Sequence, residues 1–150
     1  MVNRHNVIDK AINVENIMCA LITHKYFPGP GLNLKFHHEV LYDPYATIGF
    51  KISLLKKCYD ELSERTINRL RRLFNIRNIF AHCGLHFTSL VDPDKSGVLD
   101  PKDRNTMLDF VSLESEFIEH EKAVLDVLMD LARKVRLPFL DENPDRQVTA

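Results

Sequence analysis

Residues 64–84 read ERTINRLRRLFNIRNIFAHCG and have the strongest helical pattern in the chain. Its apolar residues recur every three or four positions, which is the spacing of one face of an α-helix. Ser63 precedes it as a natural N-cap, and Glu64 puts negative charge where the helix dipole favours it. Gly84 stands where a helix stop belongs, so we expect an amphipathic helix from Glu64 to about His82. The expected apolar side consists of Ile67, Leu70, Leu73, Phe74 and Phe80.

Three further segments have helical spacing. The first, Arg4 to Tyr26, is followed by FPGPG at 27–31, which cannot continue a helix well. The second runs from about Tyr45 to Leu62. Asp100-Pro101 has the residue types of an N-cap and first helical position, so the last helix should run from there to about Arg136, ~50 Å at 1.5 Å per residue.

These helices predict an all-α fold, an antiparallel bundle of about four main helices. We expect only a short helical turn around His37 to Tyr42 and a loop from Cys83 to Asp100. With 150 residues, the chain suits a single helical domain over 1–137 followed by a polar C-terminal tail over 138–150. Five glycines and no tryptophan argue against a turn-rich β-sandwich.

Charge and cysteine content limit the class of protein. The 20 basic and 21 acidic residues give a net charge of −1, which excludes a broadly basic nucleic-acid coat but leaves room for a local basic patch. Three scattered cysteines suit a reducing cytosol better than a disulfide framework. No charged-then-apolar leader and no run of ~18 apolar residues is present, so we expect a cytoplasmic protein without a membrane span.

The end of the 64–82 helix contains a candidate catalytic pair. Arg77 and His82 are separated by four residues, and Asn78 follows the arginine directly. Arginine grips phosphate with a fork of donors, and histidine can move a proton near neutral pH. Together they are the minimum equipment for cleaving RNA without a metal. The alternative from the residues alone is structural: Arg77 could pair with an acid on a neighbouring helix, and His82 could be a polar C-terminal residue.

This motif resembles the HEPN superfamily, whose helical bundles carry Arg, four to six residues and then His. The segments TIGFKISLLKKCYDEL (47–62) and INRLRRLFNIRNIFAHC (67–83) are similar to the mannitol-operon-repressor-like branch and related uncharacterised families. The likeness covers about Tyr45 to Gly84, and elsewhere only the number of helices. It implies Arg77 and His82 as catalytic residues, with Asn78 as polar companion, in a metal-independent endoribonuclease.

The resemblance also implies a symmetric homodimer with both motifs at a shared cleft, and no cofactor. It places the protein in a toxin or defence setting with RNA as substrate and an antitoxin or regulatory protein as partner. Superfamily toxins silenced by nucleotide transfer carry tyrosine two residues after the histidine, where this chain has Gly84, so that switch is not expected. The alternative function is a non-catalytic regulatory or protein-interaction module of the repressor-like type.

Four basic residues are candidates for RNA binding. Arg65, Arg69 and Arg72 recur at spacings of four and three, so they share a stripe that could hold an RNA backbone or remain simply solvated. The resemblance adds Lys51, which could face the motif helix.

Metal sites have little support in the sequence. Asp92 to Asp103 places oxygen ligands and a glycine as in an EF-hand calcium loop, but position twelve is aspartate rather than glutamate. The alternative is a turn followed by an Asp100 N-cap. No paired cysteine or His-Glu-x-x-His pattern exists, so we expect no metal centre.

Overall fold

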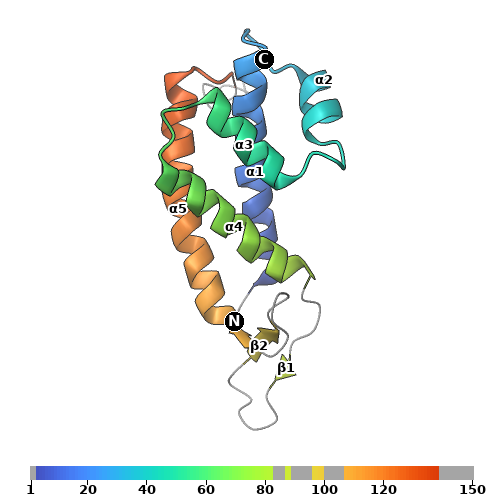
Figure 1. Ribbon diagram of the computed structural model, residues 1–150, viewed down its shortest axis with the longest axis vertical. Coiled ribbons are helices and arrows are strands. Elements are labelled where there is room, and N and C mark those ends of the chain that lie inside the picture. The colour runs from blue at the N-terminus through green and yellow to red at the C-terminus, as the bar shows by residue number, and fades with distance from the viewer. Residues whose placement is uncertain (1–2, 83–86, 89–95, 100–106, 139–150) are drawn as a thin grey trace, which may run out of the picture.

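The protein is a helical bundle with a small antiparallel sheet at one end (Figure 1). The computed structural model describes residues 3–82, 87–88, 96–99 and 107–138. The helices are α1 (Arg4–Tyr26), α2 (Leu34–Phe36), the π-helix η1 (His37–Leu41), α3 (Ile48–Cys58), α4 (Glu64–His82) and α5 (Phe110–Lys134). The strands are β1 (Phe87–Thr88), β2 (Ser96–Leu99) and β3 (Met107–Asp109). The predicted all-α bundle is confirmed, and the sheet was not expected.

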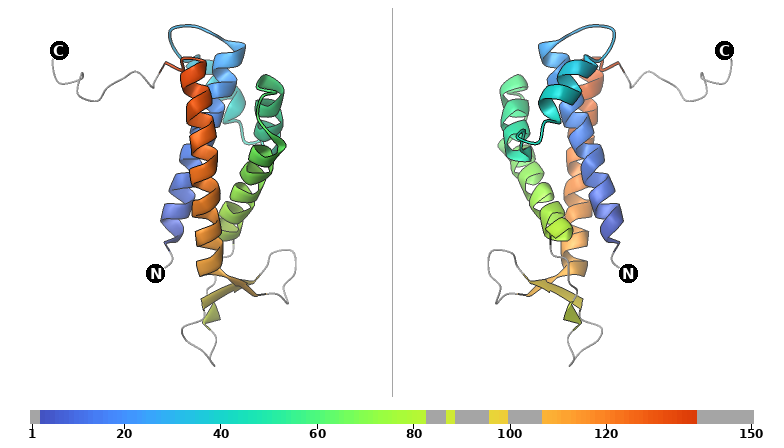
Figure 2. Two further views of the ribbon diagram at one scale, coloured as in Figure 1. Left: turned by 90° about the vertical axis from the view of Figure 1, so that its left-hand side faces the viewer. Right: turned by 90° about the vertical axis from the view of Figure 1, so that its right-hand side faces the viewer.

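The long helices form two layers, α1 with α5 and α3 with α4 (Figure 2). Helix α4 crosses α1 and α5 in the opposite direction, as expected for an antiparallel bundle. Helices α1 and α5 run in the same direction, because α2 and η1 carry the chain back along α1 before α3 begins (Figure 1). The helical turn expected near His37 is thus part of the connection that lets α1 and α5 run in the same direction.

One cluster of buried apolar side chains joins these helices. Phe80 of α4 and Phe110 of α5 meet edge to face, with ring centroids 4.9 Å apart and planes at 68°. Such a contact is the preferred geometry of an aromatic pair. It fixes the C-terminal end of α4, which carries the candidate motif, against the start of α5. The largest fully buried side chains include Phe74, Phe80, Phe110, Phe117 and Met18.

Helices α1 and α4 begin and end where the sequence predicts. The Asn3 side chain caps α1 by accepting from Asn6 N at 3.1 Å. Ser63 Oγ accepts from Thr66 N at 3.2 Å, so Ser63 serves α4 as the expected N-cap.

Helix α3 is shorter than the predicted 45–62 segment. Thr47 caps it by accepting from Phe50 N at 3.2 Å, so the helix starts at Ile48. At the other end Tyr59 leaves helical geometry, and its buried hydroxyl donates to Leu21 O at 2.7 Å. The helix therefore ends at Cys58, and the Tyr59 side chain connects this end to α1.

The predicted start of the last helix at Asp100-Pro101 is wrong. Met107–Asp109 is the extended strand β3, paired with Ser96–Leu99 of β2, so part of the predicted 83–100 loop is also strand. Helix α5 starts at Phe110, where Asp109 Oδ1 accepts from Val111 N at 2.9 Å. Asp109 is thus the N-cap of the last helix, and Asp100 lies outside the described residues.

Candidate functional site

Helix α4 carries the three motif residues at its C-terminal end. It is α-helical throughout, so Arg77 and His82 lie ~140° apart around its axis and ~7.5 Å apart along it. His82, the last residue of the helix, is exposed, and Arg77 is half-buried. Asn78, also half-buried, precedes His82 by four residues and shares its face of the helix. A single copy therefore does not put Arg77 and His82 on one face.

Arg77 has no carboxylate partner among the described residues. Its Nε is buried and makes no hydrogen bond within the same part of the chain. The Arg77 Cζ lies 5.6 Å from the centroid of the Phe74 ring, within the range of a cation–π contact. The alternative in which an acid of a neighbouring helix neutralises Arg77 therefore finds no support in the described residues.

A second arginine, which the sequence analysis missed, reaches the same end of the bundle. Arg4 Nη2, at the start of α1, donates to the Ala81 carbonyl at 2.8 Å. That carbonyl is one of the last of α4 and has no partner within the helix. Ala81 follows Arg77 by four residues and precedes His82, so Arg4 brings its guanidinium group beside the motif. Arginine in the first turn of a helix opposes the helix dipole, and this was the available signal that Arg4 serves another purpose.

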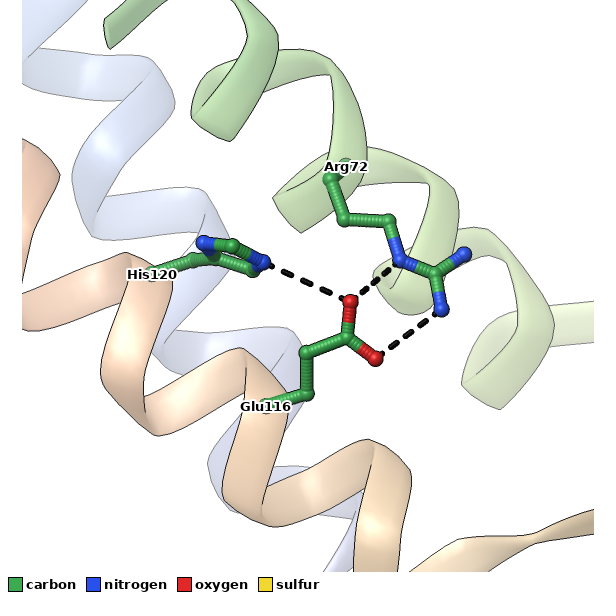
Figure 3. A network of polar contacts seen from close by, with 3 residues as sticks. All are labelled: Arg72, Glu116 and His120. Carbon is green, nitrogen blue, oxygen red and sulfur yellow. Dashed lines mark hydrogen bonds and ion pairs between the residues drawn. The ribbon is translucent and has the colours of Figure 1, made fainter. Parts of the chain in front are cut away.

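One of the three arginines in the predicted RNA-binding stripe of α4 is paired with a carboxylate of α5. Arg72 grips Glu116 of α5 with two hydrogen bonds, Nε to Oε1 at 2.5 Å and Nη2 to Oε2 at 2.9 Å (Figure 3). His120 Nε2 lies 3.4 Å from the same Oε1. The hydrogen bonds from Arg72 lower the pKa of Glu116. Arg72 therefore connects α4 to α5.

Arg65 and Arg69 keep their guanidinium groups free of carboxylates among the described residues. Arg65 is exposed and Arg69 is half-buried. Of the predicted stripe, Arg65 and Arg69 are thus the two arginines without a carboxylate among the described residues.

Lys51, the fourth predicted RNA-binding residue, is buried and paired with a carboxylate. It is only 3% exposed, and its Nζ forms an ion pair of 2.6 Å with Glu15 Oε1 of α1. The same Nζ lies 4.6 Å from the centroid of the Tyr42 ring. The Lys51 ammonium group thus lies between α1, α3 and the residue that follows η1.

The remaining predicted features lie largely outside the described residues. Of the Asp92–Asp103 loop the structure describes only 96–99, which is strand β2. The predicted tail is outside as well, apart from Pro138. Within the described ranges, no three histidine, cysteine, aspartate or glutamate side chains gather in a metal-binding arrangement. No helix of those ranges is long and apolar enough to cross a membrane.

Comparison with known proteins adds no relative: no family model, no curated protein and no solved structure matches this chain. The fold alone therefore defines the class of the protein, which is a helical bundle.

Proposed function

We propose that the protein is a metal-independent endoribonuclease of the HEPN type. Arg77 and His82 are its catalytic pair, Asn78 their polar companion, and a homodimer its active form. A toxin or defence role in the cytoplasm, where RNA is available and the free thiols of Cys19 and Cys58 stay reduced, belongs to the same proposal.

One observation carries the proposal: the Arg77 guanidinium has no carboxylate partner among the described residues. A half-buried cation without a counter-ion is costly unless an anion completes it. Phosphate suits this role because arginine can grip two of its oxygens at once. Arg4, beside the last turn of α4, adds a second cation within the same region.

The residues fit cleavage by the RNA 2′-hydroxyl. A neutral His82 accepts the 2′-hydroxyl proton as the oxygen attacks the adjacent phosphorus, and Arg77 stabilises the charge on the phosphorane oxygens. A second, protonated histidine gives its proton to the departing 5′-oxygen. The products are a 2′,3′-cyclic phosphate and a 5′-hydroxyl, and DNA is spared because it lacks the attacking group.

The separation of Arg77 and His82 around α4 supports a two-copy site. Two motifs related by a twofold axis supply two histidines, one as base and one as acid, together with two arginines. Arg77 of one copy then acts with His82 of the other. This arrangement removes the need for both side chains to share one face of a single helix.

The test is the rate of RNA cleavage by variants at Arg77. Arg77→Ala should lower kcat by about 10²–10³, the usual effect of removing one group that stabilises transition-state charge. Arg77→Lys should remain strongly impaired, because lysine lacks the planar fork. Arg71→Ala is the matched control: Arg71 is exposed on the same helix, where it binds only Asn68 among the described residues, so its activity should stay within twofold. Equal loss in Arg71→Ala and Arg77→Ala would contradict the assigned role.

A second candidate is a non-catalytic regulatory or protein-interaction module of the repressor-like type. The ~140° between Arg77 and His82 favours it if the protein acts as a single copy. It predicts a folded protein that cleaves no RNA at any concentration, including those at which a dimer forms.

A further inference from the structure

A shallow, open pocket of about 330 Å³ lies where η1, the following turn and the start of α3 meet. Its apolar lining includes Val40, Tyr45 and Phe50, which are 45%, 93% and 49% exposed. In Figure 1 these elements stand on the outer side of α1, away from the end of α4. This surface is thus separate from the proposed catalytic site. The remaining lining residues are Glu39, Asp43 and Ala46.

The backbone holds Tyr45 in this exposed position. Asp43 accepts twice, at Oδ1 from Tyr45 N at 2.8 Å and at its carbonyl from Ala46 N at 2.9 Å. Thr47 then caps α3, so the turn is anchored on both sides. On the other side of the pocket, the wide π-turn of η1 presents Glu39 and Val40, and π-helical turns are frequent at functional sites. A large aromatic side chain is therefore kept in water by ordered structure.

The rim of the pocket is negatively charged. Neither Glu39 nor Asp43 forms an ion pair with any described residue. Lys51, the nearest lysine along α3, is buried and already paired with Glu15. A second copy docked symmetrically on this surface would bring four carboxylates together, which like-charge repulsion disfavours. Charge complementarity instead selects a cationic partner.

We propose that this pocket binds a segment of a partner protein in which arginine or lysine side chains flank apolar ones. Apolar side chains cover Val40 and Phe50, and Tyr45 packs against the segment as the central aromatic anchor. The cations meet Glu39 and Asp43 and can stack on the aromatic rings. A macromolecular segment fits better than a small molecule, because an open hollow cannot enclose most of a small ligand's surface.

The probe is a short fluorescein-labelled peptide that alternates arginine and leucine, beside a twin in which glutamate replaces every arginine. Fluorescence anisotropy with the full chain should detect the arginine peptide only. Glu39→Gln/Asp43→Asn should weaken binding by about fivefold, since each exposed charge pair contributes little, and Tyr45→Ala by about tenfold. Glu119→Gln/Asp126→Asn is the control: it removes two exposed carboxylates of α5 and should leave the affinity within twofold.

Three outcomes would overturn the proposal. Equal binding of both peptides would show that the negative rim does not distinguish a cationic segment from an anionic one. Equal weakening by the two double variants would assign binding to net charge rather than to the pocket. Sedimentation velocity completes the set: if the chain self-associates through this face, Tyr45→Ala dissociates it and the occupant is a second copy. Circular dichroism of each variant establishes that it is folded. None of these results depends on ribonuclease activity.

Discussion

Glu15→Gln should destabilise the protein far more than an ordinary surface substitution. Lys51 reaches Glu15 from α3 to α1, and the two side chains are only 4% and 17% exposed. Replacing the carboxylate with an amide keeps the shape and one acceptor oxygen. It leaves the buried ammonium of Lys51 without a counter-ion, and that is the costly part of the change.

The magnitude follows from the geometry. At 2.6 Å and an effective dielectric constant of about 20, the two charges attract by about 6 kcal/mol, most of which offsets the desolvation of both ions. Removing one partner of a buried pair usually costs ~3–5 kcal/mol, and the amide retains part of the hydrogen bond. We therefore expect the free energy of unfolding to fall by about 3 kcal/mol.

Urea denaturation followed by circular dichroism measures this loss. Glu61→Gln is the matched control, since Glu61 pairs with Lys134 at 3.1 Å and these side chains are 44% and 69% exposed. Its substitution should cost less than about 1 kcal/mol. Adding Lys51→Met to Glu15→Gln removes the stranded charge while keeping an aliphatic stem, so the double variant should regain at least about 1 kcal/mol.

The result that would refute this reasoning is a Glu15→Gln protein within about 1 kcal/mol of the parent. That would mean that water reaches Lys51 Nζ. A double variant less stable than Glu15→Gln alone would also refute it, because the unpaired ammonium of Lys51 would then be stabilising rather than costly.

Three other predictions concern pH and thiols. Arg72 lowers the pKa of Glu116, so this carboxylate stabilises the fold above its unfolded pKa of about 4.3 and loses that effect as pH falls through the lower folded pKa. Glu116→Gln should therefore reduce the difference in unfolding free energy between pH 7 and pH 3, by under about 1 kcal/mol because both side chains of the pair are over a third exposed. An unchanged difference would contradict this prediction. Burial raises the pKa of Tyr59 to about 12, so the contribution of its neutral hydroxyl to stability is full below the unfolded pKa of about 10 and disappears as pH rises through 12. In thermal unfolding, Tyr59→Phe should cost about 1 kcal/mol at pH 7 and less at pH 11. An equal cost at both pH values would be inconsistent with this prediction. Burial raises the pKa of the Cys19 thiol to about 11, and burial also raises the pKa of the Cys58 thiol. Mass spectrometry should therefore find both thiols unlabelled by a water-soluble thiol reagent at pH 7.5 until the protein unfolds, and rapid labelling of either would refute its burial.

Helix limits were predictable where the determining groups are close in sequence. Asn3 and Ser63 cap the helices that follow them, so the starts of α1 and α4 are local properties. The start of α5 is not local, because the three residues before it, Met107–Asp109, are held as a strand by pairing with β2. The same holds for the end of α3, which Tyr59 fixes through a carbonyl of α1.

The candidate site was predictable only as a list of side chains. The motif spacing identified Arg77, Asn78 and His82, but the absence of a described counter-ion for Arg77 depends on the packing of neighbouring helices. Lys51 read as a surface cation, yet its partner lies on another helix, where no spacing rule reaches it.

RNA cleavage by His82 and Arg77 without a metal can be tested in a single experiment. Purified protein is incubated in EDTA with an end-labelled single-stranded RNA, beside a His82→Ala variant prepared identically and compared by circular dichroism and sedimentation. We expect cleavage by the parent with 2′,3′-cyclic phosphate ends, no cleavage of the matching DNA, and loss of activity in His82→Ala. Undiminished cleavage by His82→Ala, or no cleavage of several RNAs by a folded, dimeric parent, would contradict it.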